Sequence, residues 1–265
     1  MIGNITLGQY FPGDSVAHRL DPRAKLVLTV ALVTTVFLAR GVLGYALIFG
    51  FCAGAALASR VSVRVMLRAV RPILYIVAIT FAINLFFAPG GDVIFRWAFV
   101  TITDQGLRTA SYMAVRLILL VFGTQLLTLT TSPISLTDGM ESLMKPLSKL
   151  GFPAHELAMM MSIALRFIPT LLEEADKIMK AQMARGADFQ SGNLIARARA
   201  MIPLLVPLFV SAFRRADELA LAMEARCYRG GEHRTRMKVL RFARLDLWAG
   251  LIVAGLAAAV VLLPF

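Results

Sequence analysis

Apolar residues gather into five long stretches, four in the first half of the chain and one at its C-terminus. A transmembrane α-helix needs about 17–25 predominantly apolar residues, and these stretches lie within or near that range. Asp21-Pro22 stands just before the first stretch, in the order expected of an N-cap residue followed by a first-turn proline. The pattern therefore predicts five membrane-spanning helices, over residues 25–39, 43–58, 72–88, 107–130 and 247–263.

The region between residues 132 and 246 has a different pattern. It holds 17 of the 28 basic residues and 12 of the 16 acidic ones, together with two apolar patches at 158–172 and 201–213. Prolines interrupt both patches, and Arg166 interrupts the first. We interpret them as two long amphipathic helices lying at or under the membrane surface. A re-entrant pair, or two additional spans, is the alternative interpretation.

The composition agrees with a membrane protein. The 265 residues are 58% hydrophobic and 17% charged, whereas soluble domains have about 45–50% apolar and roughly 25% charged residues. This argues against a soluble enzyme, a disordered chain and a disulfide-stapled module. We predict an all-α integral membrane protein with about five transmembrane helices. Its expected domains are a four-helix membrane domain (1–131), a cytoplasmic domain with the two amphipathic helices (132–244) and a C-terminal transmembrane helix (245–265).

The basic residues predict the orientation. The chain carries a net charge of +12, and the loop expected between the second and third spans contains Arg60, Arg64, Arg68 and Arg71. Since cytoplasmic loops are enriched in Lys and Arg, this loop and the N-terminus are expected inside the cell. The following loop, residues 89–106, has one Arg and two Asp. The two cysteines, Cys52 and Cys227, are expected as free thiols.

Two segments of the charged region resemble each other at an offset of 41 residues. Thr170–Asp176 corresponds to Ser211–Asp217, and Ala181–Arg185 to Ala222–Arg226. Both are rich in helix-forming residues, so each predicts a long helix that ends near its arginine. An arginine in the last turn stabilises a helix by about 0.3–1 kcal/mol, which could explain either residue alone. Two arginines with small alanine neighbours instead suggest helix ends that enter two similar acidic grooves of a dimeric partner.

These residues carry a resemblance to a known family. Ala184-Arg185-Gly186 and Ala225-Arg226-Cys227 resemble the two Ala-Arg-Gly motifs of the transmembrane T component (EcfT, CbiQ-like) of energy-coupling factor (ECF) transporters. The N-terminal runs Tyr10–Ser15 and His18–Arg23 also resemble the opening of that family. These transporters are ATP-driven importers of vitamins and related micronutrients in prokaryotes. Cys227 is a departure, because the motif usually has glycine there, and only glycine has full backbone freedom.

The resemblance implies a non-catalytic coupling subunit in the plasma or inner membrane of a prokaryote. Two ABC-type ATPase subunits would take Arg185 and Arg226, one each, and would bind the ATP and Mg²⁺. A separate membrane subunit, the S component, would bind the vitamin. The region around Met159, Met160 and Met161 is a possible contact for that subunit, because methionine surfaces repack easily. Ordinary apolar packing is the alternative.

Other chemistry is poorly represented in the sequence. There is no G-x-x-x-x-G-K-[ST] motif for binding nucleotide phosphates. His155-Glu156 begins like a zinc-protease helix, but position 159 is Met, so no metal site is expected in this chain. The basic run before the last span suits topological charge at the cytoplasmic face, and no nucleic-acid-binding fold is recognised, so nucleic-acid binding is not expected. Arg116, inside the fourth apolar stretch, is expected to snorkel or to pair with a backbone carbonyl or a polar group such as Asn84, unless it has a functional role.

A stand-alone secondary transporter or membrane enzyme is the rival interpretation. Such a protein would need clustered ionisable groups at bilayer depth. The predicted spans offer little beyond Arg116 and scattered hydroxyl residues, so the coupling subunit is the favoured interpretation.

Overall fold

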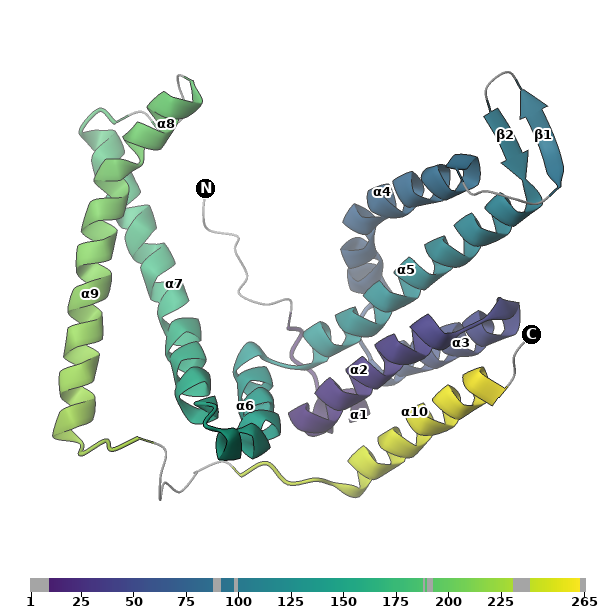
Figure 1. Cartoon of the computed structure of the whole chain (residues 1–265). Helices are drawn as coiled ribbons and strands as arrows, with labels where there is room; N and C mark the ends of the chain where they lie inside the picture. Colours follow the sequence, from purple (N-terminus) through teal and green to yellow (C-terminus); the bar gives the residue numbers. More distant parts are fainter. Residues whose placement is uncertain are drawn as a thin grey trace. The chain divides into compact units, whose positions relative to one another are not determined.

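The chain is mainly helical in a computed structural model, which describes residues 10–87, 92–97, 100–187, 189, 193–230 and 239–262. Figure 1 shows long helices joined by short turns and one β-hairpin. The helices are α1 (Val16–Arg19), α2 (Pro22–Leu38), α3 (Gly41–Ser59), α4 (Val63–Phe87), α5 (Asp104–Thr130), α6 (Pro133–Met144), the 3-10 helix η1 (Lys145–Leu150), α7 (Ala154–Ala184), α8 (Leu194–Ala200), α9 (Ile202–Ala225) and α10 (Arg244–Leu262). The hairpin consists of the antiparallel strands β1 (Val93–Trp97) and β2 (Val100–Thr103).

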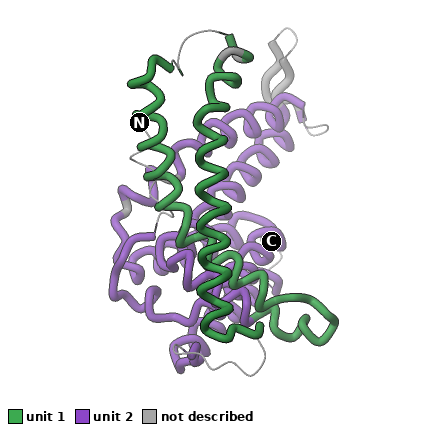
Figure 2. Tube along the Cα trace, turned by 90° about the vertical axis from the view of Figure 1, so that its left-hand side faces the viewer, with its two compact units in different colours: residues 1–7, 143–238 green, residues 8–142, 239–265 purple. Residues whose placement is uncertain are grey.

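The chain divides into two compact units (Figure 2). The membrane unit comprises residues 8–142 and 239–265, and the helix-pair unit comprises residues 1–7 and 143–238. The domain boundaries that we predicted at 131/132 and 244/245 stay predictions.

The core of the membrane unit lies where α2, α3, α5 and α10 meet. Val36, Ile48, Leu119 and Val260 come from these four helices and are at most 2% exposed. A Cβ atom on Gly123 of α5 would lie 2.9 Å from a methyl group of Leu32, so glycine lets α2 approach α5 closely here. Side chains from the first half of the chain and from its C-terminal helix thus pack into one apolar cluster.

The outer faces of these helices are apolar as well. Val30, Phe49 and Trp248 are each more than 60% exposed, which suits a surface covered by lipid rather than by water. Among the described residues, five helices are long and apolar enough to cross a membrane. They are Gly41–Ser59, Val70–Phe87, Asp104–Thr130, Ala154–Ala184 and Arg244–Leu262. This confirms the predicted class, an all-α membrane protein with about five such helices.

One of these five helices is not among the five spans that the sequence predicted. The first predicted span forms α2, which has 17 residues and lies at the lower limit for crossing a bilayer. Instead α7, which the sequence placed at the membrane surface, qualifies by length and composition. The reason is that Arg166 and Glu156 are its only Lys, Arg, Asp or Glu residues before position 173. Asp21 does cap α2, as predicted, and its carboxylate accepts a hydrogen bond from the Arg23 N–H.

The predicted loop between the second and third spans is shorter than expected. α4 begins at Val63, so Arg64, Arg68 and Arg71 belong to this helix and not to a loop. Pro72 lies inside α4, and the helix bends along its length (Figure 1). A proline inside a helix removes one backbone hydrogen bond and commonly kinks the helix without ending it. The loop predicted over 89–106 likewise contains the hairpin and the start of α5, and its residues 89–91 and 98–99 lie outside the described residues.

Candidate coupling site

The helix-pair unit is built on two long antiparallel helices, α7 and α9 (Figure 1). Near one end, Gln182 Nε2 donates a hydrogen bond to the Pro203 carbonyl at 3.4 Å. At the other end, Tyr228 Oη lies 3.4 Å from His155 Nε2. The end of each helix therefore lies beside the start of the other, which places the two helix C-termini at opposite ends of the pair.

A polar clasp joins the middle of the two helices. Ser211 Oγ donates a short hydrogen bond to Glu174 Oε1, and Arg215 Nη2 donates to Glu174 Oε2 at 2.7 Å. Glu174 lies beyond the apolar patch of α7, which ends at Leu172. The clasp thus joins a carboxylate of α7 to a hydroxyl and a guanidinium of α9.

The C-terminus of α7 is closed by a Schellman cap. Arg185 is the C-cap residue, and Gly186 follows with φ +87°. The Gly186 N–H donates to the Met183 carbonyl and the Ala187 N–H to the Gln182 carbonyl, both at 3.0 Å. This is the pair of reverse hydrogen bonds that defines the motif. The predicted helix end near Arg185 is confirmed, and Gly186 supplies the left-handed residue of the cap.

The C-terminus of α9 has the same cap. Arg226 is the C-cap residue, the Cys227 N–H donates to the Glu224 carbonyl at 2.8 Å, and the Tyr228 N–H donates to the Met223 carbonyl at 3.0 Å. Cys227 adopts the left-handed conformation, with φ +54°, that glycine has in the first cap. This costs roughly 1–2 kcal/mol for a residue with a side chain. Cysteine in place of glycine therefore changes the energy of the turn but not its geometry.

The two arginines are presented outward in the same way. All six motif residues are exposed: Ala184, Arg185, Gly186, Ala225, Arg226 and Cys227. Among the described residues, neither arginine side chain has a hydrogen bond or an ion pair. Since α9 has 24 residues, its length sets the two ends about 36 Å apart. The pair thus carries two like guanidinium groups at two distant points.

The methionine cluster lies in the apolar half of α7. Met160 and Met161 are 54% and 52% exposed, and Met159 is half-buried. On α9 an exposed apolar row follows helical spacing: Ile202, Val206, Phe209 and Phe213. Both long helices therefore present apolar surface in the same unit as the arginine ends.

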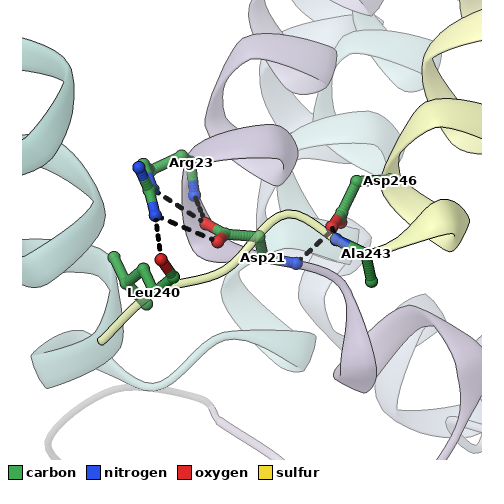
Figure 3. Close-up of polar contacts among 5 residues, drawn as sticks. All are labelled: Asp21, Arg23, Leu240, Ala243 and Asp246. Atoms are coloured by element: carbon green, nitrogen blue, oxygen red, sulfur yellow. Dashed lines mark hydrogen bonds and ion pairs between the residues drawn. The ribbon is translucent and has the colours of Figure 1, made fainter. Parts of the chain in front are cut away.

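The membrane unit contains a buried polar junction that the sequence analysis did not predict (Figure 3). Asp246 accepts hydrogen bonds from the Asp21 N–H at 2.8 Å and from the Ala243 N–H at 2.7 Å. Arg23 pairs with Asp21 and donates to the Leu240 carbonyl at 2.7 Å. The junction fastens the segment that leads into α10 to the start of α2. No local signal could reveal it, since Asp21 and Asp246 are 225 residues apart.

Lys25 forms a second buried contact at the start of α2. Its ammonium group donates to the Thr130 carbonyl at 2.9 Å and to Thr131 Oγ1 at 3.2 Å. Only 7% of Lys25 is exposed. The end of α5 and the start of α2 are therefore held together by a buried cation with three oxygen partners, the third being the His18 carbonyl.

Arg116 pairs with a polar side chain, as expected, and that side chain is Tyr45. Its Nε and Nη2 atoms donate to Tyr45 Oη at 3.1 and 2.8 Å, and its guanidinium lies 5.8 Å from the centre of the Phe37 ring. Asn84, the example that we named, donates to the Thr80 carbonyl of its own helix. Arg116 thus links α5 to α3.

The structure defines the class: a multi-pass helical membrane protein that carries two equivalent arginine-tipped helix ends. Residues 13–237 match the family described as cobalt transport protein, CbiQ. A relative from Thermosediminibacter oceani, named energy-coupling factor transporter transmembrane protein EcfT, is 58% identical over 254 residues, which cover 96% of this chain and 95% of the relative. The chain belongs to this family of transmembrane components of ECF transporters, as its motifs indicated.

Other relatives with the same name are similar over comparable lengths. The protein from Clostridium kluyveri is 54% identical over 252 residues, covering 95% of this chain and 93% of the relative. The protein from Bacillus subtilis is 48% identical over 262 residues, covering 99% of this chain and 97% of the relative. The similarity therefore extends over both the membrane unit and the helix pair.

Proposed function

We propose that this chain is the coupling subunit of an ATP-driven micronutrient importer of a prokaryotic cell membrane. It transmits movement from two ABC-type ATPase subunits to a substrate-binding S component. ATP and Mg²⁺ are bound by the ATPases, and this chain supplies contacts and no catalytic group. The observation that carries the proposal is the repetition of one cap, with one exposed arginine, at both ends of the α7–α9 pair.

The geometry of the helix ends suits docking into grooves. Each arginine follows an exposed alanine, so little side-chain bulk surrounds the guanidinium. A guanidinium binds carboxylates through two parallel hydrogen bonds, and such charge-assisted contacts contribute about 1.5–3 kcal/mol. Two equivalent ends fit a partner that presents two equivalent acidic grooves, as a pair of related ATPase subunits would.

The helix pair itself is suited to transmit movement. Contacts at both ends and the clasp at its centre brace α7 against α9, so displacement of one arginine end is carried to the other. A loosely packed pair would absorb this movement. In the proposed cycle, nucleotide-driven movement of the two grooves changes the position of the braced pair as a whole.

The exposed apolar surface of the pair is the proposed contact for the S component. Met160 and Met161 would lie against it together with Met159, and the row from Ile202 to Phe213 on α9 would supply a second apolar patch towards the other end of the pair. Methionine packs against differently shaped partners at low cost. A photo-crosslinker placed at Met160 in the assembled complex is expected to reach a small membrane protein; crosslinks to lipid alone would remove this contact.

Charge reversal tests the docking of the arginines. Arg185→Glu and Arg226→Glu are each expected to weaken capture of the ATPase subunits by the tagged full-length chain, and the double variant to abolish it. Undiminished capture by the double variant would remove both residues from the proposal. Transport by this chain alone in vesicles without ATP would support the rival, a secondary transporter.

Matched controls separate docking from a general charge effect. Lys149→Glu in η1 and Arg199→Glu in α8 make the same change of charge at exposed positions of the same unit. Both control variants are expected to capture the ATPases as well as the unchanged chain does.

A further inference from the structure

One face of α4 carries a row of arginines. Arg64, Arg68 and Arg71 are spaced by four and three residues, so they share one face of the helix, and all three are exposed. Met66 and Val70, two residues further along the chain from Arg64 and Arg68, are 1% and 6% exposed and face the core. The arginine row therefore lies on the side of α4 that points away from the core of the membrane unit.

The same row continues into the membrane-spanning part of the helix. Tyr75 follows Arg71 by four residues and is 75% exposed, and Ile79 follows Tyr75 by four and is 60% exposed. Both belong to the apolar span Val70–Phe87. Exposed side chains of a span contact lipid, and tyrosine is enriched where a span meets the headgroups. A row that faces hydrocarbon at Ile79 faces phospholipid headgroups at its arginine end.

Among the described residues, the arginine row has no partner of opposite charge. Residues 63–87 contain no Asp or Glu. In the part of the chain that the structure describes, the three guanidinium groups form no hydrogen bond or ion pair. Arg64 also lies in the first turn of α4, where unpaired backbone N–H groups attract anions.

The dimensions agree with a headgroup layer. The rise from Arg71 to Arg64 is about 10 Å, whereas the headgroup region on each side of a bilayer is roughly 5–8 Å thick. Arg71 lies at the first turn of the span, Arg68 lies within this depth of it, and the long side chain of Arg64 can reach back towards it. Guanidinium groups bind phosphate oxygens in pairs, which an ammonium group cannot do.

We propose that Arg64, Arg68 and Arg71 form a binding surface for the phosphate headgroups of anionic phospholipids. If the arginines served only to fix the orientation of the helix in the membrane, positive charge alone would suffice, and lysine supplies it equally well. A headgroup site requires the paired hydrogen bonds of arginine. This difference makes the proposal testable, and it is independent of the proposed coupling function.

The test uses the purified full-length chain in mild detergent with an equimolar mixture of phosphatidylglycerol and phosphatidylcholine. Bound lipids are identified by native mass spectrometry. The unchanged chain is expected to retain phosphatidylglycerol in preference to phosphatidylcholine. The triple variant Arg64→Gln, Arg68→Gln, Arg71→Gln is expected to lose about tenfold or more of this preference, because each basic residue near an anionic surface contributes independently. The triple lysine variant, which preserves charge and topology, is expected to fall between the two.

A control variant removes the same charge elsewhere. Lys145→Gln, Lys149→Gln and Arg241→Gln also remove three exposed positive charges, and the preference is expected to persist. The single variants Arg68→Gln and Arg71→Gln serve if the triple variant does not fold, and each is expected to reduce the preference.

Three results would overturn the proposal. They are an unchanged preference in the glutamine variants, an equal loss in the control variant, and full retention in the lysine variant, which would leave only topological charge. If the glutamine variants keep the lipid preference but lose ATPase capture, the surface binds a protein partner and not lipid.

Discussion

Arg215 Nη2 lies 2.7 Å from Glu174 Oε2, and the two residues hold corresponding positions in the segments that repeat at an offset of 41 residues. In the first segment this position and the one before it are glutamates, and in the second they are arginines. The repeat gives both helices the same end, while the difference in charge makes the two copies attract each other at the centre. An antiparallel pair of identical copies would place like charges there.

The ion pair predicts rescue by charge exchange. Glu174→Arg alone puts two arginines in contact and is expected to lower the unfolding free energy by about 1 kcal/mol, the upper range for partly exposed pairs. Combined with Arg215→Glu, it is expected to recover most of this loss, as measured by denaturant unfolding of the purified chain.

A neighbouring pair provides the control for this exchange. Asp176 and Lys180 form an ion pair at 2.7 Å within α7 and do not join it to α9. Asp176→Asn is expected to leave ATPase capture unchanged, whereas Glu174→Arg is expected to reduce it by loosening the helix pair. Equal effects of the two substitutions would contradict a role for the clasp in positioning the arginine ends.

Substitutions of the left-handed residues in the two caps are expected to change stability in opposite directions. Cys227→Gly removes a strained side chain and is expected to stabilise the chain by about 1 kcal/mol, whereas Gly186→Ala introduces the same strain and is expected to destabilise it by about 1 kcal/mol. Thermal unfolding measures both. Loss of stability in Cys227→Gly would mean that the thiol makes contacts worth more than the backbone strain.

The helix ends could be predicted from local sequence, whereas the contacts between distant segments could not. The 41-residue repeat indicated Arg185 and Arg226 as helix ends, and Asp21-Pro22 indicated the start of α2, because caps depend on neighbouring residues. The start of α4 at Val63 was missed, since arginines before an apolar stretch suit a loop and an amphipathic helix equally well. The hairpin of β1 and β2 was also missed because its strands have only five and four residues.

Side-chain partners show the same limit. The sequence marked Arg116 as a charge that needs a partner but could not select Tyr45, which lies 71 residues away and meets it only through packing of α3 on α5. In the Schellman caps, by contrast, every hydrogen bond joins residues at most five apart. The sequence interpretation was therefore accurate for contacts between residues close in the sequence and failed for contacts between distant ones.

The buried junction predicts a large effect of one carboxylate. Asp246→Ala leaves the buried Asp21 N–H without an acceptor and removes the bond to the Ala243 N–H, so we expect a loss of about 3 kcal/mol in unfolding free energy. Asp104→Ala is the control, because Asp104 opens α5 but forms only an exposed pair with Arg108. The control is expected to change stability by less than about 0.5 kcal/mol. Similar losses in both variants would mean that the junction contributes no more than a surface contact.

The two cysteines allow the orientation and the docking to be measured together. Cys227 is exposed beside Arg226, whereas Cys52 is 1% exposed in the core of the membrane unit, so a membrane-impermeant maleimide is expected to react with Cys227 alone. If the arginine ends face the cytoplasm, labelling occurs in inverted vesicles and not in intact cells, and bound ATPase subunits protect the thiol. Arg226→Glu is expected to abolish this protection, and Cys227→Gly to abolish labelling. Labelling of intact cells would contradict the proposed orientation. If bound ATPase subunits do not reduce the labelling of Cys227, the end of α9 is not their docking point.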